Sequence, residues 1–572
     1  MGVSRRSFIT TMAAGAAIGA LSATELANNA LASPLTVNDA AATPQASPAG
    51  DVVGKITVGY QGWFACIGDG APINGWWHWS NNMSQAPSPS NNNIKAWPDM
   101  SEYTNGYQTA YSNCNNGQPA ELFSSYDQQT VNTHFLWMQQ NGCDTAALQR
   151  FDPNGSEGPT RDAMATKVRS AAEAYGRKFY IMYDVTDWTN MASEITVDWT
   201  NKMSALTQSS AYAMQNGKPV VCIWGFGLDD ANHNFAASDC LNVINWFKSQ
   251  GCYVIGGVAR EWRSGDNGSR AGFSDVYHAF NMISPWMVGA IGTVSDSDYY
   301  YTADNVPDVA DCAANGIDYQ PCVLPGDVSA NQRVHGDLMW RQFYNMIRAG
   351  AQGIYISMFD EFGEGNQIAK TTPTQATVPA SSGLLSLDQD GTACSSDYYL
   401  RLTADGGRML KGQIALTATR PTAPVVSGGG GGTNANLALN SASAESSHTQ
   451  NYSSGNAVDG NPSTYWESAN NAFPQWLQVD LGTSTSVSRL VLDLPPATDW
   501  GARTQTFSVL GSTDGSNFST VIGSAPHTFD PASGNTVTIT CTPTTLRYLR
   551  VNFTANTGWP AGQCSELQVY AS

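Results

Sequence analysis

Three carboxylates stand within five residues of one another, directly after an apolar strand-like run: Asp360, Glu361 and Glu364. Glycines at 363 and 365 flank the last of them. Like charges this close cannot all ionise cheaply, so at least one of these acids is expected to have a raised pKa. A carboxyl group with a raised pKa can act as a general acid, as cleavage of a glycosidic bond requires. A solvated acidic loop is the alternative interpretation.

Acidic and aromatic residues also follow other apolar runs along the chain. If those runs are parallel strands of one barrel, the side chains beyond them gather at its carboxyl end. Carboxylates transfer protons in glycosidases, and indole rings stack on the apolar faces of sugars. For each single residue, a capped turn or packing at the rim is the alternative. The predicted substrate-binding residues are Tyr60, Trp63, Asp152, Asp184, Asp187, Trp224, Glu261 and Asp360.

The elements that would position these side chains are eight apolar runs between residues 51 and 420. Helical patterns precede several of them, for example at 161–175, 241–249 and 336–349. Repeating units of this size predict an α/β fold, a (β/α)8 TIM-like barrel. A doubly wound sheet is the alternative, but no glycine-rich phosphate turn follows the first run. The eight runs are 56–64, 145–151, 178–184, 220–226, 253–261, 286–291, 318–324 and 353–359.

The clearest domain boundary is the polyglycine run 428–432, which follows a segment rich in Pro and Thr. Polyglycine buries no surface and behaves as a flexible tether, so 421–433 is predicted to be a linker. From 434 to 572 the sequence turns to short alternating segments punctuated by Gly, Asn and Asp, which predict an all-β domain.

The N-terminus is typical of an export signal. Arg5 and Arg6 precede an apolar run, and Ala30-Leu31-Ala32 offers small residues for cleavage. We therefore expect a twin-arginine signal peptide at 1–32, a disordered lead-in at 33–50 and a secreted, extracellular protein. No later stretch reaches about 20 apolar residues, so no membrane span is expected.

Composition narrows the class of ligand. The chain has 572 residues, with 47 Asp+Glu against 28 Lys+Arg and a net charge of −19. This acidic balance argues against nucleic acid and against anionic membranes as partners. Few charges (13%) and many aromatic residues (10%) suit a neutral ring-shaped ligand, so we expect an oligo- or polysaccharide. We expect a monomer.

The cysteines give no indication of a metal site. None of the 11 stands in a CxxC or Cys/His cluster with zinc spacing, so no cofactor is expected for catalysis. Some disulfides are expected in an exported protein, and the pair expected first is Cys541 with Cys564, because both lie in one small domain.

The segment Ile356–Ile368 resembles the N-E-W-x-E-G-T-Q-I segment of glycoside hydrolase family 99, the endo-α-mannosidases. The resemblance extends to the wider group of family 71 and 99 barrels and covers about 55–370. It also rests on Val58–Phe64, Gly75–Trp79 and the stretch from Tyr126 through His134–Met138 to Phe151.

In that family the two glutamates of the segment carry the chemistry, and they map onto Glu361 and Glu364. The resemblance implies that Glu364 protonates the leaving oxygen and later activates water. It implies that Glu361 deprotonates the substrate's own 2-hydroxyl, which attacks the anomeric carbon to give an anhydro-sugar intermediate with retention. An endo-α-1,3-glucanase-like or other α-glycan hydrolase is the alternative, and a non-catalytic glycan-binding protein is the alternative of another class.

The chain departs from the family pattern inside the same segment. Asp360 stands where the family has Asn, Phe362 where it has Trp, and Asn366 where it has Thr. The opening Tyr60–Phe64 also replaces a Tyr-Tyr-Pro-Trp-Tyr type of sequence. The resemblance therefore carries the catalytic pair and not the specificity for mannose.

Residues 434–572 resemble a discoidin, or coagulation factor 5/8 type C, module of the carbohydrate-binding module family 32 type. The resemblance rests on Asn436–Ala438, Ala457–Trp466, Trp476–Gly482, Ser512–Gly515, Arg547–Val551 and Ser565–Tyr570. It implies a β-sandwich, with His448, Trp500, Arg503 and Trp559 as a ligand face. It also implies a structural Ca²⁺ on Asp459, Thr464 and Glu566, whereas a plain turn is the alternative for Asp459.

Overall fold

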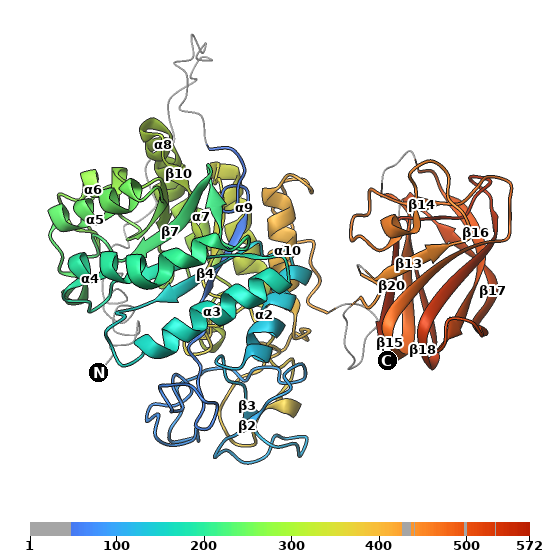
Figure 1. The fold of residues 1–572 in the computed structure, drawn as a ribbon, viewed down its shortest axis with the longest axis horizontal. Coiled ribbons are helices and arrows are strands. Elements are labelled where there is room, and N and C mark those ends of the chain that lie inside the picture. The colour runs from blue at the N-terminus through green and yellow to red at the C-terminus, as the bar shows by residue number, and fades with distance from the viewer. Residues whose placement is uncertain (1–46, 426–435, 440, 497–499, 532–533, 572) are drawn as a thin grey trace, which may run out of the picture. The chain divides into compact units, whose positions relative to one another are not determined.

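The structure is a computed structural model that describes residues 47–425, 436–439, 441–496, 500–531 and 534–571 (Figure 1). The predicted signal peptide 1–32, the lead-in up to residue 46 and the glycine run 428–432 lie outside these residues. The chain divides into two compact units, residues 1–425 and 426–572. In the part that the structure describes, no helix is both long and apolar enough to cross a bilayer.

The N-terminal unit is built on a parallel sheet whose strands follow the order β10-β9-β8-β7-β5-β4-β1-β12-β11. The short β6 (Met214–Gln215) adds an antiparallel partner to β7. Most residues of the parallel strands are buried, as expected where helices cover a parallel sheet. The parallel strands are β1 (Ile56–Tyr60), β4 (Thr145–Arg150), β5 (Lys178–Asp184), β7 (Lys218–Trp224), β8 (Tyr253–Val258), β9 (Met282–Pro285), β10 (Asp318–Tyr319), β11 (Cys322–Val323) and β12 (Ile354–Ile356).

The sheet closes on itself through β10 and β11, which are two halves of one interrupted strand. Gln320 and Pro321 separate them, and proline has no N–H to give to a ladder. Gln320 N donates to Ile283 O of β9 at 2.9 Å, and Tyr355 N of β12 donates to Pro321 O at 3.0 Å. With β10 and β11 taken as one strand, eight strands form a ring, and the predicted (β/α)8 barrel is confirmed.

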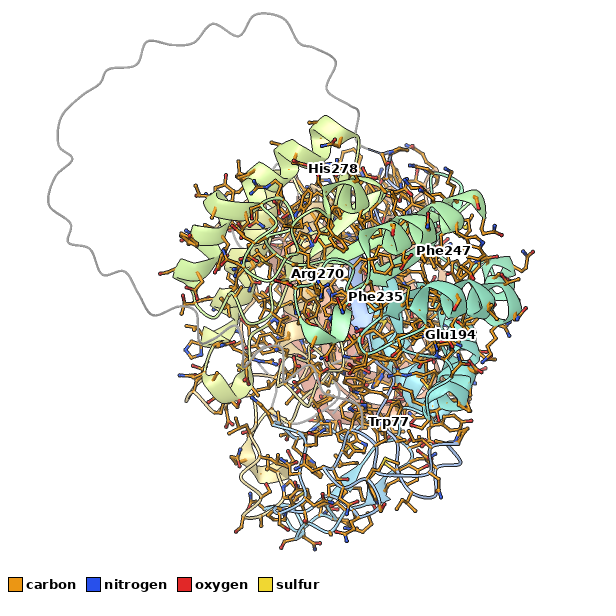
Figure 2. The ribbon with its side chains drawn as sticks, turned by 90° about the vertical axis from the view of Figure 1, so that its left-hand side faces the viewer. Trp77, Glu194, Phe235, Phe247, Arg270 and His278 are labelled. Atoms are coloured by element: carbon orange, nitrogen blue, oxygen red, sulfur yellow. The ribbon has the colours of Figure 1, made fainter. Side chains whose placement is uncertain are left out.

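Helical segments follow the strands and cover the outside of the ring (Figure 1). Figure 2 shows Phe247 of α5 and Glu194 of α4 in this outer layer. The three predicted helical stretches are confirmed to within a few residues at α3, α5 and α9. The helices are α2 (Gln128–Gln140), α3 (Gly158–Ala174), α4 (Met191–Asp198), α5 (Ala237–Ser249), α6 (Ser274–His278), α7 (Val294–Tyr300), α8 (Val306–Asn315), α9 (Asp337–Ala349) and α10 (Tyr398–Leu410).

The predicted sixth strand is wrong in its position. The sequence favours 286–291, but the strand is Met282–Pro285. Trp286, Met287 and Ile291 are buried in the loop that follows it. An apolar run marks burial, and burial alone does not separate a strand from a packed loop.

The barrel unit extends beyond its predicted boundaries at 51 and 420. Ser47 N donates to Asp318 Oδ1 at 3.0 Å, and Pro48 O accepts from Gln215 Nε2 at 2.8 Å. At the other end, Thr422 Oγ1 donates to Asp405 Oδ2 of α10 at 2.6 Å. Residues assigned to the lead-in and the linker are thus tied to the barrel, because these hydrogen bonds outweigh a local composition typical of disorder.

Two long connections at the carboxyl end support the acidic loop. One runs from β1 to α2 and holds the hairpin of β2 (Tyr107–Gln108) and β3 (Glu121–Leu122), and the other follows β12. Ala96 bridges to Leu385, and Lys95 N donates to Phe362 O at 3.0 Å. Lys370 pairs with Glu102 across the same junction. The loop that carries Asp360, Glu361 and Glu364 is therefore held from both sides.

The C-terminal unit is an antiparallel β domain, as predicted. Its six-stranded sheet is arranged around two long strands, β15 and β18, whose pairing shifts register between Asp480 and Thr485. Its core has no residues in common with that of the barrel. The strands are β13 (Ala442–Glu445), β14 (Trp466–Glu467), β15 (Gln475–Asp493), β16 (Arg503–Ser512), β17 (Ser519–Phe529), β18 (Thr536–Asn556), β19 (Gln563–Cys564) and β20 (Glu566–Ala571).

The predicted disulfide between Cys541 and Cys564 is wrong. Both cysteines fall within the described ranges, and each is a free thiol there. Cys541 Sγ contacts Val487 O at 3.7 Å, whereas Cys564 Sγ contacts Glu566 O at 3.2 Å. Membership of one small domain does not bring two cysteines within the short Cβ–Cβ distance that a disulfide needs.

Candidate active site

Asp360 joins the end of β12 to the end of β1. Its side chain is fully buried, and its two oxygens accept from the backbone N–H groups of Gln61 (2.8 Å) and Gly62 (2.9 Å). Burial raises the pKa of Asp360 to about 6, against the opposing effect of those two hydrogen bonds. Asp360 therefore positions the backbone of β1's end, which differs from the substrate contact expected of it.

Glu361 lies next to the side chain of Gln61. Only 3% of Glu361 is exposed, and its Oε2 accepts from Gln61 Nε2 at 2.9 Å. A hydrogen bond donated to a carboxylate favours its ionised form. Glu364 lies three residues further on and is half-buried, so one acid of the predicted pair is enclosed and the other is partly exposed.

Gly363 leaves room for the Glu361 carboxylate. A Cβ atom at this position would lie 3.0 Å from Glu361 Oε1 and 3.4 Å from Asn93 O. Such contacts are tighter than ordinary van der Waals distances, so any larger residue would press on the carboxylate. The glycine between the two glutamates therefore keeps the geometry of the pair.

Tyr60 does not reach the mouth of the barrel. It is fully buried, and its hydroxyl is 2.9 Å from His134 Nδ1, whose Nε2 is 2.8 Å from the Tyr103 hydroxyl. Burial lowers the pKa of His134 to about 3, so the imidazole is neutral and carries one proton between two phenols. Tyr60 thus belongs to the support of the site, because the side chain at this point of β1 faces helix α2.

Arg161 of α3 fastens the end of β1 from the other side. It is 3% exposed, and its Nη1 donates to Gln61 O at 2.5 Å while its Nε donates to Glu157 Oε2 at 2.7 Å. Its guanidinium lies 4.9 Å from the centre of the Phe151 ring and 5.0 Å from that of Trp77. Cation–π contacts of this kind hold a buried cation without a second carboxylate.

Trp63 is half-buried among other rings. The His78 ring stacks on it at 3.6 Å, and the ring of Phe151 lies parallel to it at 6.1 Å. Figure 2 shows the neighbouring Trp77 among the loops beyond the barrel. Trp63 therefore stacks within the protein, so the edge of its ring is more accessible to a sugar than the face.

Asp184, at the end of β5, is linked to the loop after β7. Thr186 Oγ1 donates to Asp184 Oδ1 at 2.5 Å and lies 3.0 Å from His233 Nε2. His233 Nδ1 lies 2.8 Å from Asp230 Oδ1. Burial raises the pKa of Asp230, but the contacts with His233 outweigh it and leave the pKa lowered. The buried Asp184 is thus connected to the half-buried Asp230 through Thr186 and His233.

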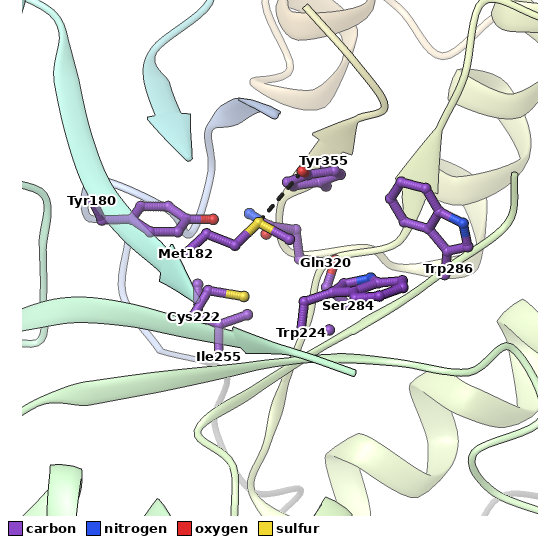
Figure 3. A pocket seen from close by; sticks show the side chains of 10 residues that line it. Tyr180, Met182, Cys222, Trp224, Ile255, Ser284, Trp286, Gln320 and Tyr355 are labelled. Atoms are coloured by element: carbon purple, nitrogen blue, oxygen red, sulfur yellow. Dashed lines mark hydrogen bonds between the residues drawn. The ribbon is translucent and has the colours of Figure 1, made fainter. Parts of the chain in front are cut away.

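Trp224 lines a narrow cavity inside the barrel, together with Trp286, Tyr180 and Tyr355 (Figure 3). The cavity has room for about one water molecule and not for a sugar ring. Trp224 is 4% exposed and meets the Trp286 ring edge to face at 5.6 Å. The two indoles therefore pack as core at the carboxyl end of β7 and β9.

The remaining predicted barrel residues lie at the rim. Glu261 pairs with its neighbour Arg260, whose Nη1 donates to the Tyr300 hydroxyl at 2.9 Å. Asp152 accepts from Asn154 N at 2.9 Å, as in a capped turn. Asp187 is exposed and has a positive φ of 58°. The structure therefore brings Asp360, Glu361 and Glu364 together on one loop. The other three acids lie around that loop at the rim.

Sequence reasoning missed three residues that contact or adjoin the acidic loop: Gln61, Gln149 and Arg161. Gln61 and Gln149 stand inside the predicted runs 56–64 and 145–151, and Arg161 begins a predicted helical stretch, whereas the residue types looked for were acids and aromatic residues beyond the runs. A neutral amide or a single arginine in a buried run carries no charge pattern. Only their position could have indicated the two glutamines, which lie at the ends of β1 and β4, and nothing in the sequence marks Arg161 of α3.

In the C-terminal domain, the predicted ligand face is only partly assembled. Arg503 lies over the Trp500 ring at 4.7 Å, and Tyr465 meets that ring edge to face at 4.7 Å. His448 is exposed, and its Nδ1 is 2.6 Å from Glu445 Oε1. Trp559 is 46% exposed. These four residues stay a predicted face.

The predicted Ca²⁺ ligands lie together. Thr464 Oγ1 donates to Asp459 Oδ2 at 2.8 Å, and Glu566 Oε1 is buried with no hydrogen-bond partner among the described residues of the domain. Burial, followed by the neighbouring Asp459, raises the pKa of Glu566 to about 8. Two carboxylates and a hydroxyl fit a calcium ion by their chemistry. Across the described ranges, no group of three or more His, Cys, Asp or Glu forms a metal cluster.

The chain was compared with known proteins. The family model of the F5/8 type C domain matches residues 441–567. Two chitosan-binding modules from a chitosanase/glucanase of Paenibacillus sp. IK-5, module 1 and module 2 (the latter with chitotriose), are 31% and 33% identical over 24% of this chain and 100% of theirs, with TM-scores of 0.21 and 0.20. The GH99 endo-alpha-mannosidase from Bacteroides thetaiotaomicron is 12% identical over 63% of this chain and 98% of its own, with a TM-score of 0.46. A search of curated proteins found no match.

Proposed function

We propose that the protein is a secreted glycoside hydrolase whose barrel cleaves α-glycosidic bonds and whose C-terminal domain, which matches the F5/8 type C family model over residues 441–567, binds glycan. The observation that carries the proposal is the acidic loop after β12. It presents an enclosed Glu361, hydrogen-bonded to Gln61, and a half-buried Glu364 at the carboxyl end of a (β/α)8 barrel.

The two glutamates differ in the way that the two proposed roles require. Glu361 accepts an N–H from Gln61, which holds its carboxylate in place and supports its role as the base that acts on the sugar's 2-hydroxyl. Glu364 is half-buried, which supports a group that reaches the leaving oxygen as an acid and then a water molecule as a base. The proposed outcome is retention through an anhydro-sugar intermediate, without a covalent bond to the enzyme.

The C-terminal domain is proposed to hold the enzyme on a glycan. Exposed Trp559 and His448 and the Trp500–Arg503 pair offer the ring faces and hydrogen bonds that sugars need. A Ca²⁺ on Asp459, Thr464 and Glu566 is proposed to stabilise this domain structurally. We expect the exported chain to act as a monomer after passage by the twin-arginine route.

The test is a hydrolysis screen of α-mannans, α-1,3-glucan, other α-glucans and chitosan, with reducing ends as the readout. We expect the wild type to release reducing ends from at least one α-glycan and Glu364→Gln to release none, while both unfold at the same temperature. Glu173→Gln, on the outer helix α3, is the matched control and should be fully active. A wild type that binds glycans but cleaves none would support a non-catalytic glycan-binding protein instead.

A further inference from the structure

Gln149 is a buried amide with no hydrogen-bond partner among the residues that the structure describes. It is fully buried near the carboxyl end of β4, and neither its Oε1 nor its Nε2 has a hydrogen bond among the described residues. An amide left unsatisfied in a core costs free energy, so native proteins keep such groups rarely and for a reason.

The side chain of Gln149 points into the barrel. Its neighbour Arg150 points out, because the Arg150 guanidinium pairs with Asp162 of α3 at 2.7 Å and with Asp198 of α4 at 2.5 Å. Successive side chains of a strand face opposite sides of the sheet. Gln149 therefore faces the barrel interior at the end where the acidic loop lies.

Gln149 lies beside Gln61. Tyr60 of β1 pairs in register with Leu148 of β4, so the next residues of the two strands are neighbours. Arg161 Nη1 reaches the backbone oxygens of both, at 2.5 Å for Gln61 and 3.5 Å for Gln149. Gln61 Nε2 donates to Glu361, but Gln61 Oε1 is buried without a hydrogen-bond partner in the described part of the chain. Two acceptors, Gln61 Oε1 and Gln149 Oε1, and one donor, Gln149 Nε2, thus have no hydrogen bond among the described residues.

Buried glutamines elsewhere in the barrel unit are bonded. Gln342 Oε1 accepts from Leu324 N at 3.1 Å, and its Nε2 donates to Leu324 O at 2.9 Å and Leu338 O at 3.1 Å. Gln215 likewise bonds Val53 N and Pro48 O. Within the described ranges, Gln149 is the buried glutamine for which both ends of the amide lack a partner.

We infer that Gln149 and Gln61 Oε1 bind neighbouring hydroxyls of the sugar ring that lies against Glu361. This inference rests on the proposed function of the same site. A planar amide donates to one hydroxyl and accepts from the next, so it matches a vicinal diol. A site built on unsatisfied amides rejects analogues that lack the hydroxyl, because their binding leaves the amide unpaired. The substrate class is therefore a pyranose with two free adjacent hydroxyls, and Gln149 sets that specificity.

The test replaces Gln149 by Met, which is unbranched and of similar size but has no amide. We expect Gln149→Met to lower kcat/KM on the glycan that the wild type cleaves by about ten- to a hundredfold. We also expect its Tm to be unchanged or a few degrees higher, because a buried unsatisfied group is removed. Gln342→Met is the matched control: it breaks three hydrogen bonds, so its Tm should fall while kcat/KM below that Tm stays near that of the wild type.

The possible results distinguish a failure of the inference from a failure of the proposed function. Full activity of Gln149→Met on the cleaved glycan would overturn the inference and leave the proposed function standing. A fall of Tm comparable to that of Gln342→Met would also overturn it, since the amide would then have a structural partner. If the wild type cleaves no glycan, the proposed function fails. The inference then stands only if Gln149→Met keeps its Tm and weakens the binding of glycan to the full chain, measured by calorimetry.

Discussion

The barrel mouth and the loops of the C-terminal domain both carry side chains suited to sugars, but they present them differently. In the barrel, Asp360 and Glu361 are almost fully buried and fixed by hydrogen bonds to Gln61 and Gly62. In the C-terminal domain, Trp559 and His448 are exposed.

The difference follows from what each region has to do. A catalytic carboxylate needs a fixed position and a protonation state set by its surroundings, which burial and oriented donors supply. A ring that stacks on a long glycan needs only an accessible face. The same residue types therefore indicate chemistry in one domain and attachment in the other, and substitutions should separate the two.

The largest expected effect is the loss of turnover on changing either glutamate of the loop. Glu361→Gln and Glu364→Gln should each lower kcat on a cleaved glycan by about a thousandfold or more, since each removes a proton-transfer group. Retention on insoluble glycan should be unaltered, because the C-terminal domain is intact. A variant that keeps more than about a tenth of the activity would remove its glutamate from the mechanism.

Deleting 428–572 tests the other side of the comparison. The two units have separate cores, so the barrel should fold alone and keep its kcat/KM on soluble substrate. Retention on insoluble glycan, measured by sedimentation, should fall by about tenfold or more. Trp559→Ala is the milder version and should weaken retention only. Loss of soluble activity in the deletion variant would mean that the units work as one.

Gly363→Ala should reduce activity through position alone. The new Cβ would stand 3.0 Å from Glu361 Oε1, so the carboxylate must shift by a few tenths of an ångström. We expect kcat to fall by about tenfold with little change in KM or Tm, because misplacement of a reacting group by less than 1 Å is costly. Unchanged kcat would show that Glu361 tolerates displacement and weaken its assignment as the base.

Asp360 should make the barrel's stability depend on pH. Its pKa in the folded protein is about 6, above the ordinary value of 3.8, so the stability it contributes is present below pH 4 and is lost as the pH rises through 6. The loss amounts to at most about 3 kcal/mol. Between pH 4 and 7, the unfolding free energy of the wild type should therefore fall relative to that of Asp360→Asn. A constant difference would contradict the raised pKa.

The smallest expected effect concerns Ca²⁺ in the C-terminal domain. For a dissociation constant of about 10 µM, 1 mM Ca²⁺ is about a hundredfold excess, which stabilises the folded domain by about 2.7 kcal/mol. We therefore expect 1 mM Ca²⁺ to raise the Tm of the domain by a few degrees. Glu566→Gln should abolish the shift, whereas Asp514→Asn, an acid in a separate turn, should preserve it. A shift that survives Glu566→Gln would place the ion elsewhere.

The sequence predicts the barrel well because its strands are buried on both faces. Runs such as 145–151 and 178–184 are continuously apolar or buried and coincide with β4 and β5. The same criterion misplaced the sixth strand, because Trp286 and Met287 are buried in a loop. Burial is encoded in residue type, whereas the exact end of a strand depends on hydrogen bonds that the type does not reveal.

The candidate site was predictable only where charge marks it. Glu361 and Glu364 stand out as a cluster after an apolar run, and the structure places them at the carboxyl end of the ring. Tyr60 was expected at the mouth, but its side chain packs against His134. Gln149 carries no charge and lies in a strand like any core residue, so its role depends on neighbours that only the fold assembles.

The central claim is that Glu361 and Glu364 cleave an α-glycoside by way of the sugar's own 2-hydroxyl. The most direct measurement is proton NMR of the first product released by the wild type from the cleaved glycan, recorded before mutarotation. We predict the α-anomer, the configuration of the bond that was broken. Release of the β-anomer first would show inversion and contradict the account.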